Sequence, residues 1–362
     1  MNILQILPRV PPAVCGIADY AWGIARGLRD QHDIHSRFLS AGTSWTEPAG
    51  TPEFPVNRLA MLSTPALVEL VKASTDDTQA LVLHLSPYGF QKRAVPFWLA
   101  SAWRQIARLP KRPRMITMFH ELYATGSVRS SAFWLQPLQK QVLRVVARAS
   151  DALRTNRQPY ADWLLGIRGL RAPEVEVMPV YSNFGEPETL PSWQEREPSM
   201  AMFAWGIHSG ESLEETVARA AACCRKFGMT GLHLLGCKQD LDDSSLGVKI
   251  TRHGFLEAAA ISRLLLSCRM AYTAYSPEHF GKSTLVAAFA AHGLALVTQG
   301  RTPVLPDGLR EGVELLHERT LPGTVRSSEL ETIARSLRSW YDTHSLKANV
   351  QSYASQIKSL YA

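Results

Sequence analysis

Four residues that often surround a phosphate stand together in this chain: Gly281, Lys282, Ser283 and Thr284. A nucleotide-binding P-loop ends in this way, but it also needs a glycine five residues before the first one. This chain has Ser276 at that position, followed by Pro277, which carries no backbone N–H donor. Nucleotide hydrolysis by a P-loop is therefore disfavoured.

The surrounding segment still suits a bound anion. An apolar strand is expected at 270–275, then a short loop, then a helix from about Ser283 to Gly293. The start of a helix offers unpaired N–H groups and the positive end of the helix dipole. A helix cap needs only one hydroxyl residue, so the added glycine and lysine favour a phosphate ligand over capping alone. The predicted anion loop comprises Glu278 and residues 281–284.

A second polar pair, His120 and Glu121, directly follows the apolar run at 115–119. Side chains at the end of a buried strand project into a ligand-binding cleft, which makes this pair a site candidate rather than a packed histidine. A zinc site of the HExxH type would need a second histidine where the chain has Ala124. We therefore expect no metal.

A third candidate lies after the first strand, where Gly16 immediately precedes a helix near 19–29 and Asp19 stands in its first turn. A glycine at such a place lets the backbone approach a ligand closely. Alone, it is more often only part of a turn, and Asp19 fits either an N-cap or a first-turn position.

Size and composition limit the class of protein. The chain has 362 residues, 46% hydrophobic and 20% charged, which is typical of a globular protein with two domains. No apolar run reaches the length of about 18–20 residues that a membrane helix needs, and no basic leader opens the chain. We expect a cytoplasmic protein. The five cysteines show no CxxC spacing, so a disulfide framework is not expected.

The net charge of +7 is concentrated in one region. Between residues 78 and 150, eleven Lys or Arg stand against one acid, Glu121. Interleaved with them are Phe90, Phe97, Trp98, Trp103, Phe133 and Trp134. Basic and aromatic side chains together fit an anionic membrane surface, on which the protein would be peripheral. A solvated basic face with the aromatic residues in the core explains the pattern equally well. Nucleic acid is disfavoured, because no recognition module is present.

Apolar strands alternate with amphipathic helices along the whole chain, the pattern of parallel sheets with crossover helices. Strands are expected at 2–7, 34–39, 80–85, 115–119 and 175–180, and again at 200–206, 232–236, 247–254, 270–275 and 294–299. The Pro- and Glu-rich segment 183–199 is the expected linker. We predict an N-terminal acceptor-binding domain at 1–182, a C-terminal donor-binding domain at 200–340, and a helix at 341–362 that packs back on the first domain. Ligands in such sheets sit at the carboxyl ends of the strands.

With these pieces in this order, the chain resembles glycosyltransferases of the GT-B fold, and family 4 of the retaining enzymes in particular. The similarity is carried by "CGIADYAWGIARGL", "FHELYA", "PVYSN" and the segment 252–297 from "RHGFLE" to "HGLALV". It implies an α/β architecture of two Rossmann-like domains facing each other across a cleft. It also implies transfer of a sugar from a nucleotide diphosphate donor, a UDP-sugar or GDP-sugar, with retention and without a metal or other cofactor.

The resemblance also implies roles for single residues. Gly16 would lie against the donor diphosphate, His120 would contact the transferred sugar, and Glu278 would bind sugar hydroxyls. The 281–284 backbone would receive the distal phosphate. The residues implied near the nucleotide are Gly206, His208, Arg252, His253, Gly254 and Phe255. The acceptor would be a lipid-linked or polysaccharide substrate, which implies a part in polysaccharide biosynthesis.

Two departures from the family pattern leave a second function open. The family carries a second glutamate eight residues after the first, where this chain has Val286, or Ala288 if the alignment is shifted for the longer helix. It also carries an arginine and a lysine after the first C-terminal strand, where this chain has Ile207 and no lysine. Two cations at a leaving diphosphate are worth several kcal/mol of transition-state stabilisation. The alternative is a weakened or inactive pseudo-transferase that binds a glycan or supports a partner enzyme.

Overall fold

The computed structural model describes residues 1–13, 15–44, 53–126, 128–205, 212–237, 239, 244–300, 304–320 and 325–361. These residues form two compact units. The first contains Met1–Met178 and Asn349–Ala362, and the second contains Pro179–Ala348. The first unit is therefore built from two separate stretches of chain.

The first unit is built on a sheet of seven strands, all paired in parallel, in the order β3-β2-β1-β4-β5-β6-β7. Its strands are β1 (Asn2–Leu7), β2 (His35–Ser40), β3 (Val56–Arg58), β4 (Ala80–Leu85), β5 (Arg114–Phe119), β6 (Ala152–Thr155) and β7 (Val175–Val177). The apolar runs of β1, β4 and β5 are buried along almost their full length, as expected for strands covered on both faces. The first six strands follow the doubly wound order of dinucleotide-binding domains.

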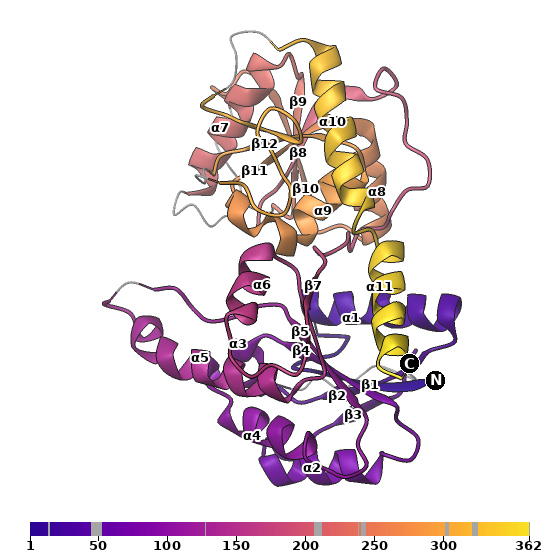
Figure 1. The fold of residues 1–362 in the computed structure, drawn as a ribbon. Helices are drawn as coiled ribbons and strands as arrows, with labels where there is room; N and C mark the ends of the chain where they lie inside the picture. Colours follow the sequence, from indigo (N-terminus) through magenta and orange to yellow (C-terminus); the bar gives the residue numbers. More distant parts are fainter. Residues whose placement is uncertain are drawn as a thin grey trace. The chain divides into compact units, whose positions relative to one another are not determined.

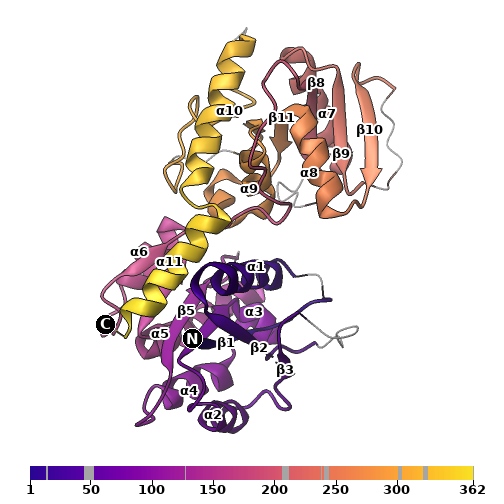
Figure 2. The same cartoon turned by 90° about the vertical axis from the view of Figure 1, so that its right-hand side faces the viewer.

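Helices cover both faces of this sheet (Figures 1 and 2). They are α1 (Gly16–His32), α2 (Thr64–Ala73), α3 (Pro87–Phe90), the 3₁₀ turn η1 (Lys92–Ala94), α4 (Phe97–Ile106), α5 (Ser131–Ala149), α6 (Gln158–Leu165) and α11 (Leu346–Ser359). Helices α2 and α4 lie on the face opposite α1 (Figure 2). Helix α11 contacts α1, where Tyr20 Oη donates to Asn349 Oδ1 at 2.9 Å.

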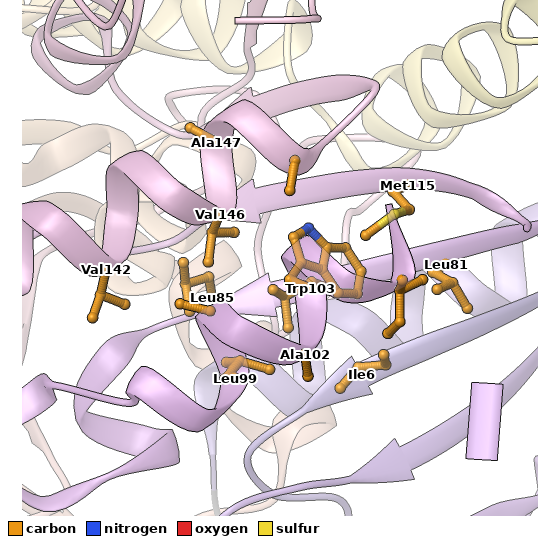
Figure 3. Packing of buried hydrophobic residues seen from close by; sticks show 14 of the residues in the cluster. Ile6, Leu81, Leu85, Leu99, Ala102, Trp103, Met115, Val142, Val146 and Ala147 are labelled. Carbon is orange, nitrogen blue, oxygen red and sulfur yellow. The ribbon is translucent and has the colours of Figure 1, made fainter. Parts of the chain in front are cut away.

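The main core of the first unit lies between the sheet and helices α2, α4 and α5. Trp103 of α4 is fully buried there, among Met115 and Leu81 of the strands and Val146 of α5 (Figure 3). Its indole N–H donates to Ser150 Oγ at 3.0 Å, so the one polar atom of this ring has a partner. The buried aromatic residues of the basic region 78–150 are thus partly explained by packing.

The second unit repeats the same strand order. Its six parallel strands run β10-β9-β8-β11-β12-β13. They are β8 (Glu197–Phe203), β9 (Gly231–Leu235), β10 (Lys249–Gly254), β11 (Cys268–Thr273), β12 (Ala295–Thr298) and β13 (Leu315–His317). Counted from β8, this order is 3-2-1-4-5-6, the order that the first sheet also follows. The two units are therefore two copies of one architecture.

The helices of the second unit are α7 (Leu213–Lys226), α8 (Ala258–Ser267), η2 (Pro277–Lys282), α9 (Thr284–Ala291) and α10 (Ser327–Asp342). Side chains of α7 and α10 share one core with the sheet. Helix α7 begins with a capping box between Ser212 and Glu215. Helix α9 is apolar almost all round and buried, as its sequence "TLVAAFAA" requires.

The α/β fold class and the doubled architecture predicted from the sequence are confirmed. Several element boundaries were wrong by two or three residues: β11 ends at Thr273 rather than 275, β8 begins at Glu197 inside the expected linker, and β7 stops at Val177. The loop expected before α9 is a 3₁₀ turn, η2. The C-terminal helix predicted at 341–362 begins later, since α10 ends at Asp342 and α11 runs from Leu346 to Ser359. No helix in the described parts of the chain is both long and apolar enough to cross a bilayer.

Candidate functional site

The turn from β11 into α9 contains the predicted anion loop. The chain leaves β11, forms η2 and enters α9 through Ser283, which is the N-cap. The N–H of Val180 donates to the carbonyl of Gly281 at 2.8 Å and so ties η2 to the segment "PVYSN". A distant segment therefore fixes the predicted anion loop in place.

Ser283 performs the capping role that was the simpler interpretation of this residue. Its hydroxyl accepts from the N–H of Val286 at 3.3 Å, and its own N–H donates to Phe280. Only the N–H groups of Thr284 and Leu285 then remain in the first turn without an intrahelical acceptor. A phosphate bound here would use these two N–H groups, the half-buried Thr284 hydroxyl and the half-buried Lys282.

Glu278 lies on η2 with a side chain that is 52% exposed. Its carboxylate is 3.5 Å from the imidazole of the neighbouring His279. An exposed carboxylate at the carboxyl end of a parallel strand is accessible to ligand hydroxyls, which is the role expected for Glu278.

The carboxyl end of β10 carries the residues expected near the nucleotide base. Phe255 is 71% exposed, and its ring stacks on Trp205 with 6.0 Å between ring centroids. Gly254 adopts a positive φ of 60°, and its carbonyl accepts from the N–H of Gly236. A side chain on Gly236 would collide with the Trp205 ring, so this glycine makes room for the aromatic pair. An exposed ring of this kind can stack on a nucleotide base.

The imidazole of His253 is paired with another histidine. Its Nε2 lies 2.9 Å from Nδ1 of His233 on the neighbouring strand β9. Burial lowers the pKa of both imidazoles, so the pair is neutral near pH 7. Arg252 stands on the same strand and is half-buried. Gly206 and His208, the other two residues expected near the nucleotide, lie outside the described residues.

Gly16 is the first residue of α1, and Asp19 lies in the first turn. The N-cap is Cys15, so of the two positions predicted for Asp19 the first turn is confirmed and the N-cap is wrong. A Cβ placed on Gly16 would meet no protein atom within 4 Å. The packing of the protein therefore does not require a glycine here, which leaves close approach of a ligand as a reason for it.

His120 and Glu121 follow β5, as predicted. Glu121 accepts a hydrogen bond of 2.8 Å from the hydroxyl of Ser86, the residue that follows β4. His120 is only 5% exposed, and its Nε2 lies 3.1 Å from Nδ1 of His84. Burial lowers the pKa of His120 to about 3. His120 is thus a neutral, tightly held imidazole at the carboxyl edge of the first sheet.

Three polar residues at the same edge were not predicted as site residues. His84 stands within β4 and bonds to His120. Asn156 and Arg157 follow β6, both are buried, and Asn156 Nδ2 donates to the carbonyl of His120 at 3.4 Å. The guanidinium of Arg157 lies over the Tyr160 ring, 4.6 Å from its centroid. A histidine inside the apolar run 80–85 was the available signal for His84, since a buried imidazole needs a partner.

The candidate residues thus gather at the carboxyl ends of parallel strands, one set in each unit. In the first unit, the Tyr20 ring of α1 meets His120 edge-on at 5.2 Å, so the start of α1 and the end of β5 are neighbours. In the second unit, the ends of β8, β10 and β11 carry Trp205, Phe255 and Glu278. Across the described residues, no group of three or more His, Cys, Asp or Glu side chains could hold a metal ion.

No family model and no curated protein matches the sequence. Solved structures match over almost the full length. Anabaena Alr3699/HepE, solved with UDP and glucose, aligns over 99% of this chain and 100% of its own with a TM-score of 0.62 and 15% identity. A putative UDP-N-acetylglucosamine 2-epimerase from Listeria monocytogenes covers 99% and 96% with a TM-score of 0.60 and 12% identity. The chain has the GT-B fold.

An α-glucosyltransferase solved with UDP and DNA shares this GT-B fold, with a TM-score of 0.58, 10% identity and coverage of 99% of each chain. At these identities the likeness establishes the architecture, whereas membership of one glycosyltransferase family stays a prediction. All three similar proteins carry a UDP or UDP-sugar ligand or substrate in their names.

Proposed function

We propose that the chain is a glycosyltransferase that moves a sugar from a nucleotide diphosphate sugar to an acceptor. The observation that carries the proposal is the turn from η2 into α9, where two N–H groups and Lys282 can hold a leaving phosphate and Val180 fixes the loop. The GT-B neighbours that bind UDP support a nucleotide-sugar donor over other anions.

The remaining roles that we propose are those that the family resemblance implies. Phe255 with Trp205 stacks on the base, the start of α9 and Lys282 hold the distal phosphate, and Glu278 binds sugar hydroxyls. His120 contacts the transferred sugar, and Gly16 lets the diphosphate approach the start of α1. Retention is proposed from the family resemblance alone. Transfer needs no metal in this proposal, since the helix start and Lys282 stabilise the departing charge.

The acceptor is lipid-linked or a polysaccharide, approached at an anionic membrane on the cytoplasmic side. Support comes from the α5 aromatic surface, by which we mean Phe133, Trp134 and Leu138, all exposed at the start of α5. Trp134 is 71% exposed, and its indole N–H donates to the carbonyl of Val128. The basic residues Arg129 and Lys140 flank this surface. Aromatic rings beside cations are typical of surfaces that enter lipid headgroups.

Sedimentation with vesicles tests the membrane contact. Vesicles containing anionic lipid should carry the protein down, and neutral vesicles should not. A Trp134→Ser and Phe133→Ser variant should bind several-fold more weakly, whereas Met61→Ser, which removes another exposed apolar side chain, should bind as the wild type does. Equal binding by all three proteins would rule out the α5 aromatic surface.

Release of nucleoside diphosphate from a panel of UDP-sugars and GDP-sugars, with and without lipid-linked acceptors, tests the transferase. Activity should fall at least about tenfold in His120→Ala and Glu278→Ala variants that remain folded. Conversion of the donor into its epimer, without release of nucleotide, would instead assign an epimerase. Neither release nor conversion with any donor would end the enzyme proposal.

One observation favours a second candidate, a pseudo-transferase that binds a glycan or supports a partner enzyme. The segment after β8, "WGIHSGES", carries no arginine or lysine for the diphosphate. A protein of this kind would keep the fold and lose the donor. Thermal stabilisation by UDP or GDP would contradict it, because a ligand that binds only the folded state raises the unfolding temperature.

A further inference from the structure

A row of four buried polar side chains crosses the centre of the first sheet. Gln5 of β1, Ser36 of β2 and His84 of β4 lie on adjacent strands, and His120 follows the next strand, β5. Gln5 Nε2 donates to Ser36 Oγ at 2.8 Å, Gln5 Oε1 lies 2.8 Å from His84 Nε2, and His84 Nδ1 lies 3.1 Å from His120 Nε2. We call this row the sheet relay.

The hydrogen bonds of the sheet relay all run in one donor-to-acceptor direction, which the bond from Gln5 to Ser36 determines. Because the Gln5 amide nitrogen donates to Ser36, its oxygen must accept, and His84 carries its proton on Nε2. A neutral imidazole has one ring proton, so His84 Nδ1 accepts in turn. His120 then donates from Nε2, and its Nδ1 keeps an unshared lone pair.

Both imidazoles are neutral, which the direction requires. His84 is fully buried and His120 nearly so, and burial lowers the pKa of each well below the ordinary value. A second proton on His84 would sit on Nδ1 and bring two N–H groups face to face at 3.1 Å. A second proton on His120 would occupy Nδ1 and remove its lone pair. A reversed Gln5 amide would turn every bond of the row and leave an N–H, not a lone pair, at His120 Nδ1.

The ring of His120 is also held in place by its surroundings. The Tyr20 ring meets it edge-on, with an interplanar angle of 84°. The backbone of His120 is held by its N–H bond to Leu85 and by Asn156, which donates to its carbonyl. Among the described residues, no protein group bonds to His120 Nδ1. Nδ1 is therefore the ring nitrogen to which a ligand can donate a hydrogen bond.

We propose that Gln5 and His84 are positioning residues that hold His120 in its Nε2–H form, so that Nδ1 is offered as a hydrogen-bond acceptor to a hydroxyl group of a bound sugar. The inference rests on the proposed function for the identity of the ligand. The state of the ring itself is a property of the resting protein. A fixed acceptor selects for a hydroxyl and against a group that can only accept, such as a carbonyl or ether oxygen.

The direct test is long-range ¹H–¹⁵N NMR of the full chain with ¹⁵N-labelled histidine near pH 7. Signals of His120 are assigned by their loss in His120→Ala. The expected spectrum shows a protonated Nε2 and an unprotonated Nδ1 for both His84 and His120. A protonated Nδ1 on His120 would overturn the proposal, whatever the activity of the protein.

Two substitutions of His84 separate positioning from packing. An asparagine places an amide oxygen near the position of Nδ1, so His84→Asn should keep the Nε2–H form of His120 and most of the activity. His84→Leu fills the space without an acceptor and should mix the ring forms and lower kcat by about tenfold or more. The control His35→Asn changes an exposed histidine and should alter neither the ring form of His120 nor kcat.

The outcomes distinguish this inference from the proposed function. If His84→Leu keeps both the ring form and kcat of the wild type, the sheet relay positions nothing. If His84→Leu does not fold, the wild-type spectrum and His84→Asn still decide. If the wild type turns over no donor, the transferase fails and the ring state alone supports or refutes the relay. Where UDP-glucose binds, it should shift Nδ1 of His120 and leave Nε2 unchanged.

Discussion

The N–H of Val180 donates to the carbonyl of Gly281 at 2.8 Å and joins two segments about a hundred residues apart in the second unit. This bond holds η2 from outside, so the start of α9 does not depend on its own short turn for its position. The loop that would bind a phosphate is therefore formed before a ligand arrives, which lowers the entropic cost of binding.

Removing that donor should weaken both the loop and its ligand. Val180→Pro deletes the N–H and should cost about 1–3 kcal/mol of unfolding free energy, because the Gly281 carbonyl loses its partner. Binding of UDP, measured by calorimetry, should weaken in parallel. Val180→Ala keeps the N–H and is the matched control. UDP binding that is equal in the proline and alanine variants would show that the bond does not organise the site.

Two glycines of α1 should respond in opposite ways to alanine. Gly16→Ala meets open space at the start of the helix and should leave stability equal or up to about 1 kcal/mol higher. Gly27→Ala would collide with Val350 of α11 and should lower stability by about 1–3 kcal/mol. If Gly16 faces the donor diphosphate, its alanine variant should nevertheless bind UDP-sugar at least about tenfold more weakly. Unchanged binding in a stable Gly16→Ala protein would remove this residue from the site.

Phe255 should contribute to nucleotide binding and little to stability. Its ring is exposed, so Phe255→Ala should change the free energy of unfolding by less than about 0.5 kcal/mol. Loss of base stacking should weaken UDP binding by about 1–3 kcal/mol in titration calorimetry. Phe133→Ala, at an exposed phenylalanine of the first unit, controls for general loss of aromatic surface. A Phe255→Ala protein with wild-type affinity would place the base elsewhere.

Stability should fall steeply with acid, because buried histidines, among them His120, His292 and His344, are neutral when folded. Burial lowers the pKa of His120 and His344 to about 3 and of His292 to about 4, against an ordinary value of 6.5. Below pH 6.5 these histidines bind protons in the unfolded chain but not in the folded chain. Stability is thus complete above pH 6.5 and is lost as the pH falls toward 4, by about 1.4 kcal/mol per pH unit for each histidine.

Urea denaturation at several pH values measures this slope. His292→Asn should reduce the slope by the contribution of one histidine, because asparagine does not titrate. Its amide can still donate to the carbonyl of Ala288, as the ring nitrogen does. The slope is independent of how much the substitution lowers stability at pH 7. A slope unchanged by this substitution would mean that His292 is already charged, or free to become so, in the folded protein.

The cap at Ser283 should affect both the stability of α9 and the binding of a phosphate at its start. Ser283→Ala removes the acceptor for the Val286 N–H and should lower stability by about 1 kcal/mol. Ser283→Asp keeps an acceptor and should restore stability while repelling a phosphate. Guanidinium denaturation and UDP titration separate the two effects. Equal phosphate binding by the serine and aspartate proteins would show that the start of α9 holds no anion.

The sequence predicted those features that a local pattern carries. Buried parallel strands such as β4 appear as apolar runs, and α9 is bounded by a hydroxyl cap and by Gly293, so both were located within two residues. The three-residue strands β3 and β13 are too short to show any periodicity, and neither was predicted. Cross-strand relationships were also out of reach. The hydrogen bond between His84 and His120 and the stacking of Trp205 on Phe255 depend on strand order. Strand order cannot be predicted from any single segment of the sequence.

The division of the first unit into two stretches has a consequence for synthesis. Residues 349–362 include Tyr353, which lies under the guanidinium of Arg154, and Asn349, which accepts from Tyr20. A nascent chain that has emerged only as far as Met178 lacks these groups and leaves the surfaces of α1 and β6 that they cover open to water. The first unit therefore cannot be completed until residues 349–361 have been made, after the whole of the second unit.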